Sequence, residues 1–380
     1  MKKQVFVYIL VTLLSAAVLF GWGKYASDGS EIFRQSVDVA PAKVLSVDAS
    51  NTVDNDSFVS TMLICTAEIL SGPHQGERVK VYQEHNSDVY SMDIVEKGDK
   101  IVIKNYPMED LGTEWAVDNY LRTSPLWFLV MMFVVLIVIF GRTKGLRTVI
   151  SLIYTCISVF AVFIPAILSG KNIYINGVCV CIFIIAMTLL LVNGWDKKTL
   201  CAFLGCTGGV LAAALITLVF SRIMKFTGYV SESSYYLTKL PHPVDLGAIA
   251  FSAVIIGAVG AVMDVAMSMS SSLYELSIKV PDISFGSLVS SGFAIGRDMM
   301  GTMANTLVLA YVGSSLSSVL LLLSYAESTM DVFNREMIAH EILQAVAGSV
   351  GIVLTIPVTA LVCGVLYVYV SKNIDITPSL

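Results

Sequence analysis

The sequence predicts a mainly α-helical, polytopic membrane helix bundle of about eight spans, with one small extracytoplasmic β-barrel-like domain of OB or SH3-like type. Two observations predict this fold class. Of the 380 residues, 56% are hydrophobic and only 14% are charged, against about a quarter in an average soluble protein. The charges are also concentrated, because residues 24–122 hold 17 acidic and nine basic residues, a net charge of −8. This composition excludes a disordered chain, an ordinary soluble enzyme and a basic nucleic-acid-binding protein.

Eight stretches are long and apolar enough to cross a bilayer as helices, which takes about 20 residues each. They are residues 5–22, 125–141, 147–168, 174–193, 199–221, 246–267, 301–323 and 342–370. The loops on one side of these spans hold ten Lys and Arg residues, against five on the other side. Because basic loops stay in the cytoplasm, both termini are expected there and residues 24–122 outside. The first span is favoured as an uncleaved anchor, with a cleaved signal peptide as the alternative.

The chain is accordingly divided into three parts. They are an N-terminal membrane anchor at 1–23, an extracytoplasmic acidic β domain at 24–122 and a membrane helix bundle at 123–380. Within the β domain, four runs rich in Val and Ile are separated by Gly-, Pro- and Ser-containing turns and are expected to be strands. These runs are 36–47, 58–70, 77–83 and 100–104.

Metal and cofactor chemistry has little support in the sequence. The seven cysteines include no CxxC pair and the four histidines do not cluster, so no disulfide framework, zinc site or haem site is expected. No cofactor is expected either. Four acidic residues of the β domain are weak candidates for contacting a cation, since their spacing matches no calcium loop: Asp54, Asp56, Glu109 and Asp110.

Polar residues return at helical spacing in the last third of the chain, inside or beside the apolar spans. The candidate ion- or substrate-binding residues are Asp264, Ser268, Arg297, Asp298, Thr302, Asn305 and Glu341. A charge at the centre of a bilayer costs about 2.5–3.5 kcal/mol, so polar stripes on three consecutive segments are expected to face each other around a water-filled cavity. The alternative is that Asp264, Asp298 and Glu341 mark interfacial ends or cap helices.

Glycine and proline offer a second argument for a site in this region. Gly292, Gly296 and Gly301 lie near the start of the seventh span, and Pro357 interrupts the eighth. Helices that break at membrane depth expose backbone carbonyl and amide groups, which transporters use to hold ions. Close helix packing with a kink is the alternative interpretation.

Three sequence blocks resemble the YibE/F family of bacterial multi-pass membrane proteins. The blocks are GAVGAVMDVAMSMSSSLYEL (257–276), GRDMMGTMANTLVLAYVGSSL (296–316) and NREMIAHEILQAVAGSVGIVLTIPVTA (334–360). The similarity extends over most of the chain, including GPHQGERVKV and EKGDKIVI in the β domain. The resemblance implies a bacterial cell-membrane location and no particular activity. The family blocks map onto Asp264, Arg297, Asp298, Asn305 and Glu341.

The leading functional hypothesis is a permease or channel-like transporter, and not an enzyme, that moves a small ion or polar solute through the cavity of the last three spans. Asp264 and Asp298 are expected to bind the cation or proton, with Glu341 as a third candidate. Thr302 and Asn305 are expected to supply neutral oxygens. The expected partners are the lipid bilayer and the transported ion or solute, and nucleic acid is not expected.

Two other functional classes were weighed. An intramembrane aspartyl protease needs two Asp residues that share a proton, but Arg297 directly precedes Asp298, and an adjacent cation keeps a carboxylate ionised. The second class is a non-catalytic membrane scaffold or accessory subunit of a cell-envelope complex, with the β domain as its binding face. A homo-oligomer and a membrane partner subunit both stay open.

Overall fold

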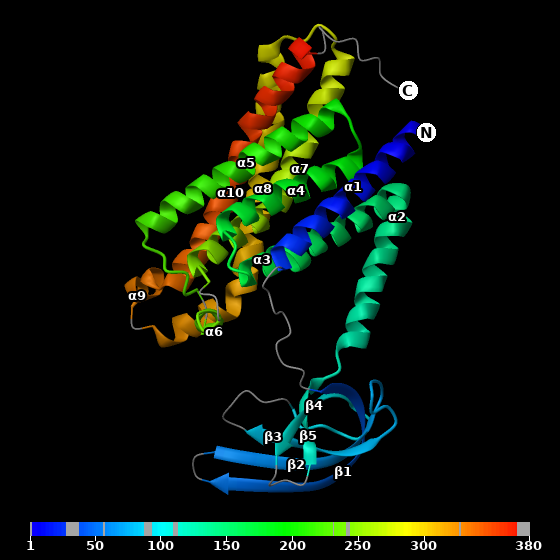
Figure 1. Ribbon diagram of the computed structural model, residues 1–380. Helices are drawn as coiled ribbons and strands as arrows, with labels where there is room; N and C mark the ends of the chain where they lie inside the picture. The colour runs from blue at the N-terminus through cyan, green and yellow to red at the C-terminus, as the bar shows by residue number, and fades with distance from the viewer. Residues whose placement is uncertain are drawn as a thin grey trace. The chain divides into compact units, whose positions relative to one another are not determined.

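The computed structural model describes the chain at residues 2–27, 38–55, 58–86, 93–108, 113–230, 232–240, 244–326 and 328–370. The four acidic cation candidates of the β domain, Asp54, Asp56, Glu109 and Asp110, lie outside the described residues or, for Asp54, outside the described side chains. The chain forms two compact units (Figure 1). One comprises Phe33–Leu136, and the other comprises Met1–Ile32 together with Ile137–Leu380.

The smaller unit contains a closed barrel of five strands in the order β1-β2-β3-β5-β4. The strands are β1 (Val39–Asn55), β2 (Phe58–Ile69), β3 (Arg78–Asn86), β4 (Lys100–Met108) and β5 (Thr113–Tyr120). Strands β3 and β5 run parallel, and all the other neighbouring pairs run antiparallel. Five strands in a Greek-key order of this kind form a barrel of the OB type. The barrel expected from the sequence is therefore present.

The four strands expected from the sequence do not include β5, which the structure contains. Its residues TEWAVDNY mix apolar and polar side chains without the Val- and Ile-rich run that marks the other strands, so its alternation is too weak to indicate a strand. Backbone pairing with β4 and β3 stabilises β5 as a strand, although its own sequence pattern does not indicate one. Trp115 and Ala116 of β5 lie opposite Val81 and Tyr82 of β3.

Alternate side chains of the strands fill the barrel, as the period of two requires. Val81 and Ile101 are fully buried there. The one buried polar side chain described in this core is Gln83 of β3, and it is satisfied. Its Nε2 donates to the Asp93 carbonyl oxygen at 2.8 Å, and its Oε1 accepts from the Val95 amide at 3.0 Å. This amide therefore fixes the segment before β4 against the barrel wall.

The remainder of the described chain is helical (Figure 1). The helices are α1 (Lys2–Ser27), α2 (Thr123–Ile157), η1 (Ser158–Phe163), α3 (Ile164–Leu168), α4 (Ile173–Asn193), α5 (Lys197–Ile223), α6 (Glu232–Leu237), α7 (Leu246–Lys279), α8 (Phe285–Tyr325), α9 (Thr329–Asn334), α10 (Glu336–Gly364) and η2 (Val365–Val370). By length and composition, seven helical runs among the described residues are able to cross a membrane. They are Tyr8–Ser27, Thr123–Leu168, Ile173–Asn193, Lys197–Ile223, Leu246–Lys279, Phe285–Tyr325 and Glu336–Tyr369.

Eight expected spans become seven helical runs because 125–141 and 147–168 both fall inside Thr123–Leu168. That run is not one straight helix. Arg142 has φ 49° and ψ −126°, outside the helical region, and marks a kink between two helical segments. The chain turns so tightly there that a Cβ at Gly145 would lie 2.1 Å from the carbonyl oxygen of Ile137. Glycine is required at 145 for this close approach.

Helices α7 and α8 are longer than their apolar stretches indicate. Helix α7 continues from the expected end at 267 to Lys279, and α8 begins at Phe285 instead of 301. The reason is that Ser, Met and Glu lower the hydropathy without ending a helix. The expected helix breaks are not found, since α8 runs without interruption through Gly292, Gly296 and Gly301, and α10 continues through Pro357.

Glycines serve close packing between helices instead. A Cβ at Gly296 of α8 would lie 2.3 Å from Ile356 of α10. On α5, a Cβ at Gly205 would lie 2.1 Å from the Thr359 hydroxyl of α10, and one at Gly209 would lie 1.8 Å from the Thr355 hydroxyl. Small residues at this spacing let two helices approach to backbone contact. Helix α10 is therefore held tightly between α5 and α8.

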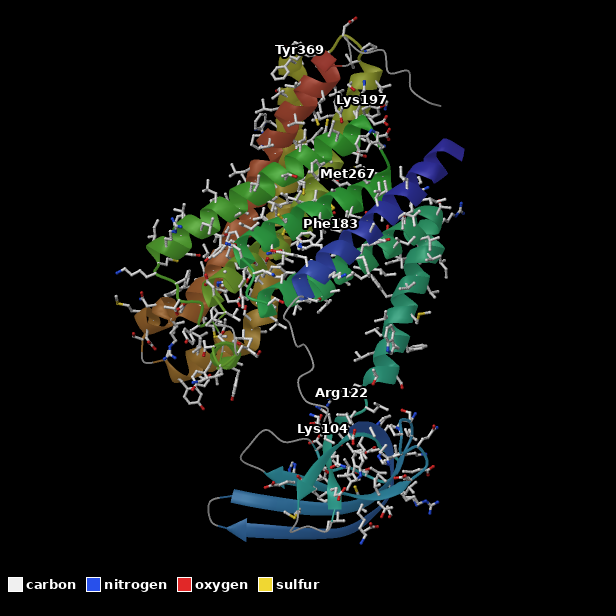
Figure 2. All side chains as sticks on the ribbon, in the orientation of Figure 1. Lys104, Arg122, Phe183, Lys197, Met267 and Tyr369 are labelled. Atoms are coloured by element: carbon white, nitrogen blue, oxygen red, sulfur yellow. The ribbon has the colours of Figure 1, made fainter. Side chains whose placement is uncertain are left out.

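The core of the bundle lies around α7. Its buried side chains pack with those of α4, α5 and α10 in one apolar cluster. Figure 2 labels Met267 on α7 and Phe183 on α4 along this part of the bundle. The large apolar side chains of α2, by contrast, are mostly exposed, as suits a helix that faces lipid.

Candidate functional site

Six of the seven candidate residues from the sequence lie on the exposed surface of α7 and α8. Asp264 and Ser268 belong to α7, and Arg297, Asp298, Thr302 and Asn305 belong to α8; all six are exposed in the isolated chain. Between Ala253 and Glu275, the exposed stripe of α7 contains small and polar residues and no large apolar one. It runs through Ala253, Gly257, Gly260, Asp264, Ser268, Ser272 and Glu275.

The structure brings α7 and α8 together as antiparallel neighbours. Gly257 of α7 packs against Tyr311 of α8, and further along the pair Leu273 of α7 packs against Gly292. Between these contacts, residues pair so that Asp264 lies at the level of Thr302. By the same register Ser268 lies at the level of Asp298. The two carboxylates are therefore separated along the bundle by about one helical turn, or about 5 Å.

Neither aspartate is neutralised within the described chain. Among the described residues, Asp264 and Asp298 have no hydrogen bond or ion pair, and the Arg297 Nε donates at 3.3 Å to the Phe293 carbonyl oxygen of its own helix. Within the described part of one chain, Arg297 therefore forms no ion pair with Asp264 or Asp298. Both carboxylates thus remain available to a cation, a proton or a partner.

Glu341 lies apart from this group. Its Oε2 accepts a hydrogen bond of 3.0 Å from the Ser315 hydroxyl of α8, and it is half-buried. Gly348 of α10 packs against Leu307 of α8 and Ala258 of α7, and Glu341 precedes Gly348 by two turns. Because helices rise about 1.5 Å per residue, Glu341 lies about 20 Å along the bundle from the level of Asp264.

A cavity of about 420 Å³ lies at a different place, where α5 ends and α7 and α10 begin. Figure 1 shows this end of the bundle beside α6 and α9. None of the seven candidate residues lines it. Its polar lining includes Tyr174, Arg222, Lys225, Glu336 and His340. Its apolar lining includes Leu218, Phe226, Ala250 and Phe251.

Part of the cavity wall is held by the Glu336 carboxylate, which joins the first residue of α10 to the segment after α5. Glu336 Oε1 accepts from the backbone amides of Thr227 at 2.7 Å and Gly228 at 2.6 Å, and its Oε2 accepts from the Thr227 hydroxyl at 2.8 Å. Gly228 has φ +90°, and a Cβ there would lie 2.3 Å from the backbone of Leu246. The segment after α5 is thus pinned against the first turns of α7 and α10.

The two cationic side chains that line the cavity make no ion pair within the described chain. Arg222 and Lys225 are exposed at its mouth and make no ion pair with any described residue. His340 is 7% exposed, packs edge-on against Phe226, and has no hydrogen-bond partner among the described residues. Asp245 caps α7 by accepting from the Ala248 amide at 3.0 Å. Both nearby carboxylates, Asp245 and Glu336, thus accept hydrogen bonds from the protein, whereas neither cation is ion-paired with a described residue.

A buried polar cluster closes the opposite end of the bundle, near the labelled Lys197 and Tyr369 in Figure 2. The Ser270 hydroxyl of α7 donates to the Lys198 carbonyl oxygen at 2.6 Å and lies 3.0 Å from the Tyr367 hydroxyl. Beside them, the buried cysteines Cys201 and Cys363 belong to one apolar cluster, which agrees with the packing role expected from the sequence. Among the described residues no three His, Cys, Asp or Glu side chains gather as metal ligands.

The fold and this polar surface define a helical protein with seven runs of membrane-spanning length and a small barrel. A family model described as "YibE/F-like protein" matches residues 129–369. The chain therefore belongs to the YibE/F-like family, as the sequence blocks indicated. The match begins within α2, so the barrel lies outside it. No curated protein and no solved structure matches the chain.

Proposed function

We propose that this chain is a multi-pass protein of the bacterial cell membrane, with cytoplasmic termini and the barrel on the extracytoplasmic side. The support is the set of seven apolar helical runs, of which Thr123–Leu168 is kinked at Arg142 and is assigned two crossings, so that an even number of crossings brings both termini to one side. The excess of Lys and Arg in the loops assigned to the inside gives the orientation. In this arrangement residues 1–23 are an uncleaved anchor, 24–122 the external domain and 123–380 the bundle.

The proposed activity is transport of a small ion or polar solute by a permease or channel-like mechanism, without enzymatic chemistry. The single observation that carries it is the pair of unneutralised carboxylates, Asp264 and Asp298, at adjacent levels of two neighbouring helices. Helix α7 has 34 residues, about 51 Å, so Asp264 lies about 27 Å from its first residue, well inside the run. Thr302 and Asn305 add neutral oxygens on the same surface.

Lipid is an unsuitable neighbour for this surface, because each charge facing hydrocarbon costs about 2.5–3.5 kcal/mol. The proposed covering is a second copy of the chain, packed with its α7 and α8 against the same helices of the first. A two-fold axis along the membrane normal keeps each residue at its own depth. Arg297 of one copy would then pair with Asp298 of the other, which leaves Asp264 for the transported cation or proton, and the small residues of α7 would permit close approach. The solute path runs along this interface.

A scaffold or accessory subunit of an envelope complex is the competing proposal. The observation that favours it is the extent of exposed apolar surface on α2, including Trp127, Phe128 and Phe140, which would also suit a membrane partner. If deletion of residues 24–122 destroyed partner capture and left flux intact, scaffolding and transport would be separate roles of one protein.

Flux in vesicles tests the transport proposal. The purified full-length chain is reconstituted in liposomes that hold pyranine, and proton movement is followed under an imposed pH gradient, with and without external Na⁺ or K⁺. The expected result is flux that Asp264→Asn abolishes. Asp282→Asn, an exposed carboxylate in the turn between α7 and α8, is the matched control. Equal flux in the Asp264→Asn and Asp282→Asn vesicles would remove Asp264 from the path.

A further inference from the structure

The cavity between the end of α5 and the starts of α7 and α10 is not used by the transport proposal. Its volume of about 420 Å³ falls in the range of small-molecule pockets, about 300–1,000 Å³. It lies some three turns or more from Asp264, and none of the candidate transport residues lines it. Its chemistry can therefore be considered by itself.

The charges of the cavity favour an anion. Arg222 and Lys225 stand at the mouth with no ion pair to any described residue. Glu336 is the only acidic side chain named in the lining, and its two oxygens already accept three hydrogen bonds from Thr227 and Gly228. That carboxylate is thus committed to the wall, and both cations remain free to pair with a ligand.

Two features of the interior point to the same ligand. His340 lines the cavity, is more than nine-tenths buried and has no hydrogen-bond partner among the described residues. Its ring nitrogens are not among the fully buried polar atoms without a partner, so they reach the open space of the cavity, where a ligand or water can bond to them. Gly247, the second residue of α7, also lines the cavity, and the amide groups at the start of a 34-residue helix favour negative charge.

The rest of the lining is apolar. It includes Leu218, Phe226, Ala250 and Phe251. A bare inorganic ion would leave these side chains against water, whereas a compact apolar group would bury them and gain about 25 cal/mol per Å² of apolar area removed from water. The walls thus select a molecule with an anionic head and an apolar body.

We propose that this cavity binds a small organic anion, in which a carboxylate or phosphate group pairs with Arg222 and Lys225 and a compact apolar body packs against Phe226 and Phe251. The imidazole of His340 donates or accepts the remaining hydrogen bond inside the cavity. The same chemistry is presented by a soluble metabolite and by the phosphate and upper chain of an anionic lipid. The proposal does not depend on the transport proposal.

Binding of defined probes to the full-length protein in phosphatidylcholine nanodiscs tests this site. Phenyl phosphate and benzoate are titrated by calorimetry, with benzyl alcohol as the uncharged probe of similar shape. Saturable binding is expected for the two anions and not for benzyl alcohol. Arg222→Gln and Lys225→Gln should each weaken phenyl phosphate binding by about tenfold to a hundredfold, the range for one charged hydrogen bond.

A matched control variant tests whether the loss of phenyl phosphate binding is specific to cations of the cavity. Lys239→Gln removes an exposed cation at the same end of the bundle, which lies over Tyr235 and not in the cavity lining, so it should leave phenyl phosphate affinity unchanged. Repeating the titration in nanodiscs that contain phosphatidylglycerol identifies the source of the ligand. If this lipid competes with phenyl phosphate, the ligand is a lipid, and if the phenyl phosphate affinity is unchanged, the ligand is a soluble anion. Equal affinity for benzyl alcohol, or unchanged affinity in both Arg222→Gln and Lys225→Gln, would overturn the proposal.

Discussion

The contact of α5 with α10 offers a direct test of the packing argument, through the substitution Gly209→Ala. A Cβ at this position would lie 1.8 Å from the Thr355 hydroxyl, 2.9 Å from Val262 and 3.0 Å from the Gly351 carbonyl oxygen. These neighbours belong to two different helices, α10 and α7. A shift of α5 away from one helix cannot relieve the contact with the other, so the added methyl group must displace the Thr355 side chain.

The expected loss of stability combines three effects. Overpacking a close-packed interior costs about 1–3 kcal/mol. Displacing Thr355 breaks its 2.7 Å hydrogen bond to the Gly351 carbonyl oxygen, worth about 1 kcal/mol. Replacing glycine by alanine inside a helix returns about 1 kcal/mol. The net expectation is a decrease of about 1–3 kcal/mol in the free energy of unfolding.

Chemical unfolding in detergent micelles measures this quantity, and Gly21→Ala is the matched control. Gly21 lies inside α1 with no atom within 4 Å of its added Cβ, so this substitution should be neutral or stabilising. In the double variant Gly209→Ala, Thr355→Ala, the removed hydroxyl should restore part of the loss. The reasoning fails if Gly209→Ala proves as stable as Gly21→Ala, or if the second substitution restores nothing.

Three further outcomes are expected. Burial raises the pKa of the Cys65 thiol from 9.0 to about 11. Because the thiol of the unfolded chain ionises first, the barrel loses stability as pH rises from 9 to 11. Labelling of Cys65 by iodoacetamide, followed by peptide mass spectrometry, should stay slow until about pH 11. In native membranes, the Asn305→Cys variant on α8 should form an oxidant-induced dimer on gels, whereas the Ile139→Cys variant on the apolar surface of α2 should not. If neither variant forms a dimer, the proposed packing of a second copy against α7 and α8 is wrong. Ser270→Ala should lower the free energy of unfolding by about 1–3 kcal/mol, measured by the same chemical unfolding, because the Lys198 carbonyl oxygen and the Tyr367 hydroxyl each lose a hydrogen bond to the Ser270 hydroxyl; an unchanged value would show that the cluster is not stabilising.

Hydropathy predicted the helical part of this fold well, since a long apolar run has few alternatives to a helix. It ended α7 near 267 and began α8 near 301, because it measures apolarity and not helix continuity. Periodicity placed Asp264 and Ser268 on one face of a helix, as found, but a period cannot tell whether that face is turned toward the bundle or away from it. The arrangement around an enclosed cavity was an added assumption.

The cavity at the end of α5 could not be predicted, because its residues are distant from one another in the sequence and none of them is unusual by itself. Arg222 and Lys225 looked like loop cations, and His340 lies more than a hundred residues later. Only the fold brings the end of α5 to the beginning of α10. A usable signal was present in Glu336 and His340, which share one helix face at i and i+4 at the start of an otherwise apolar run.

The attachment of Glu336 to Thr227 and Gly228 has a consequence for motion. Three hydrogen bonds join the first residue of α10 to the segment that follows α5, and that segment carries Lys225. A displacement of the α10 start must either carry this segment along or break all three bonds together. The spacing between Lys225 and His340 is therefore held constant through small rearrangements, and changes only in a step large enough to detach the carboxylate.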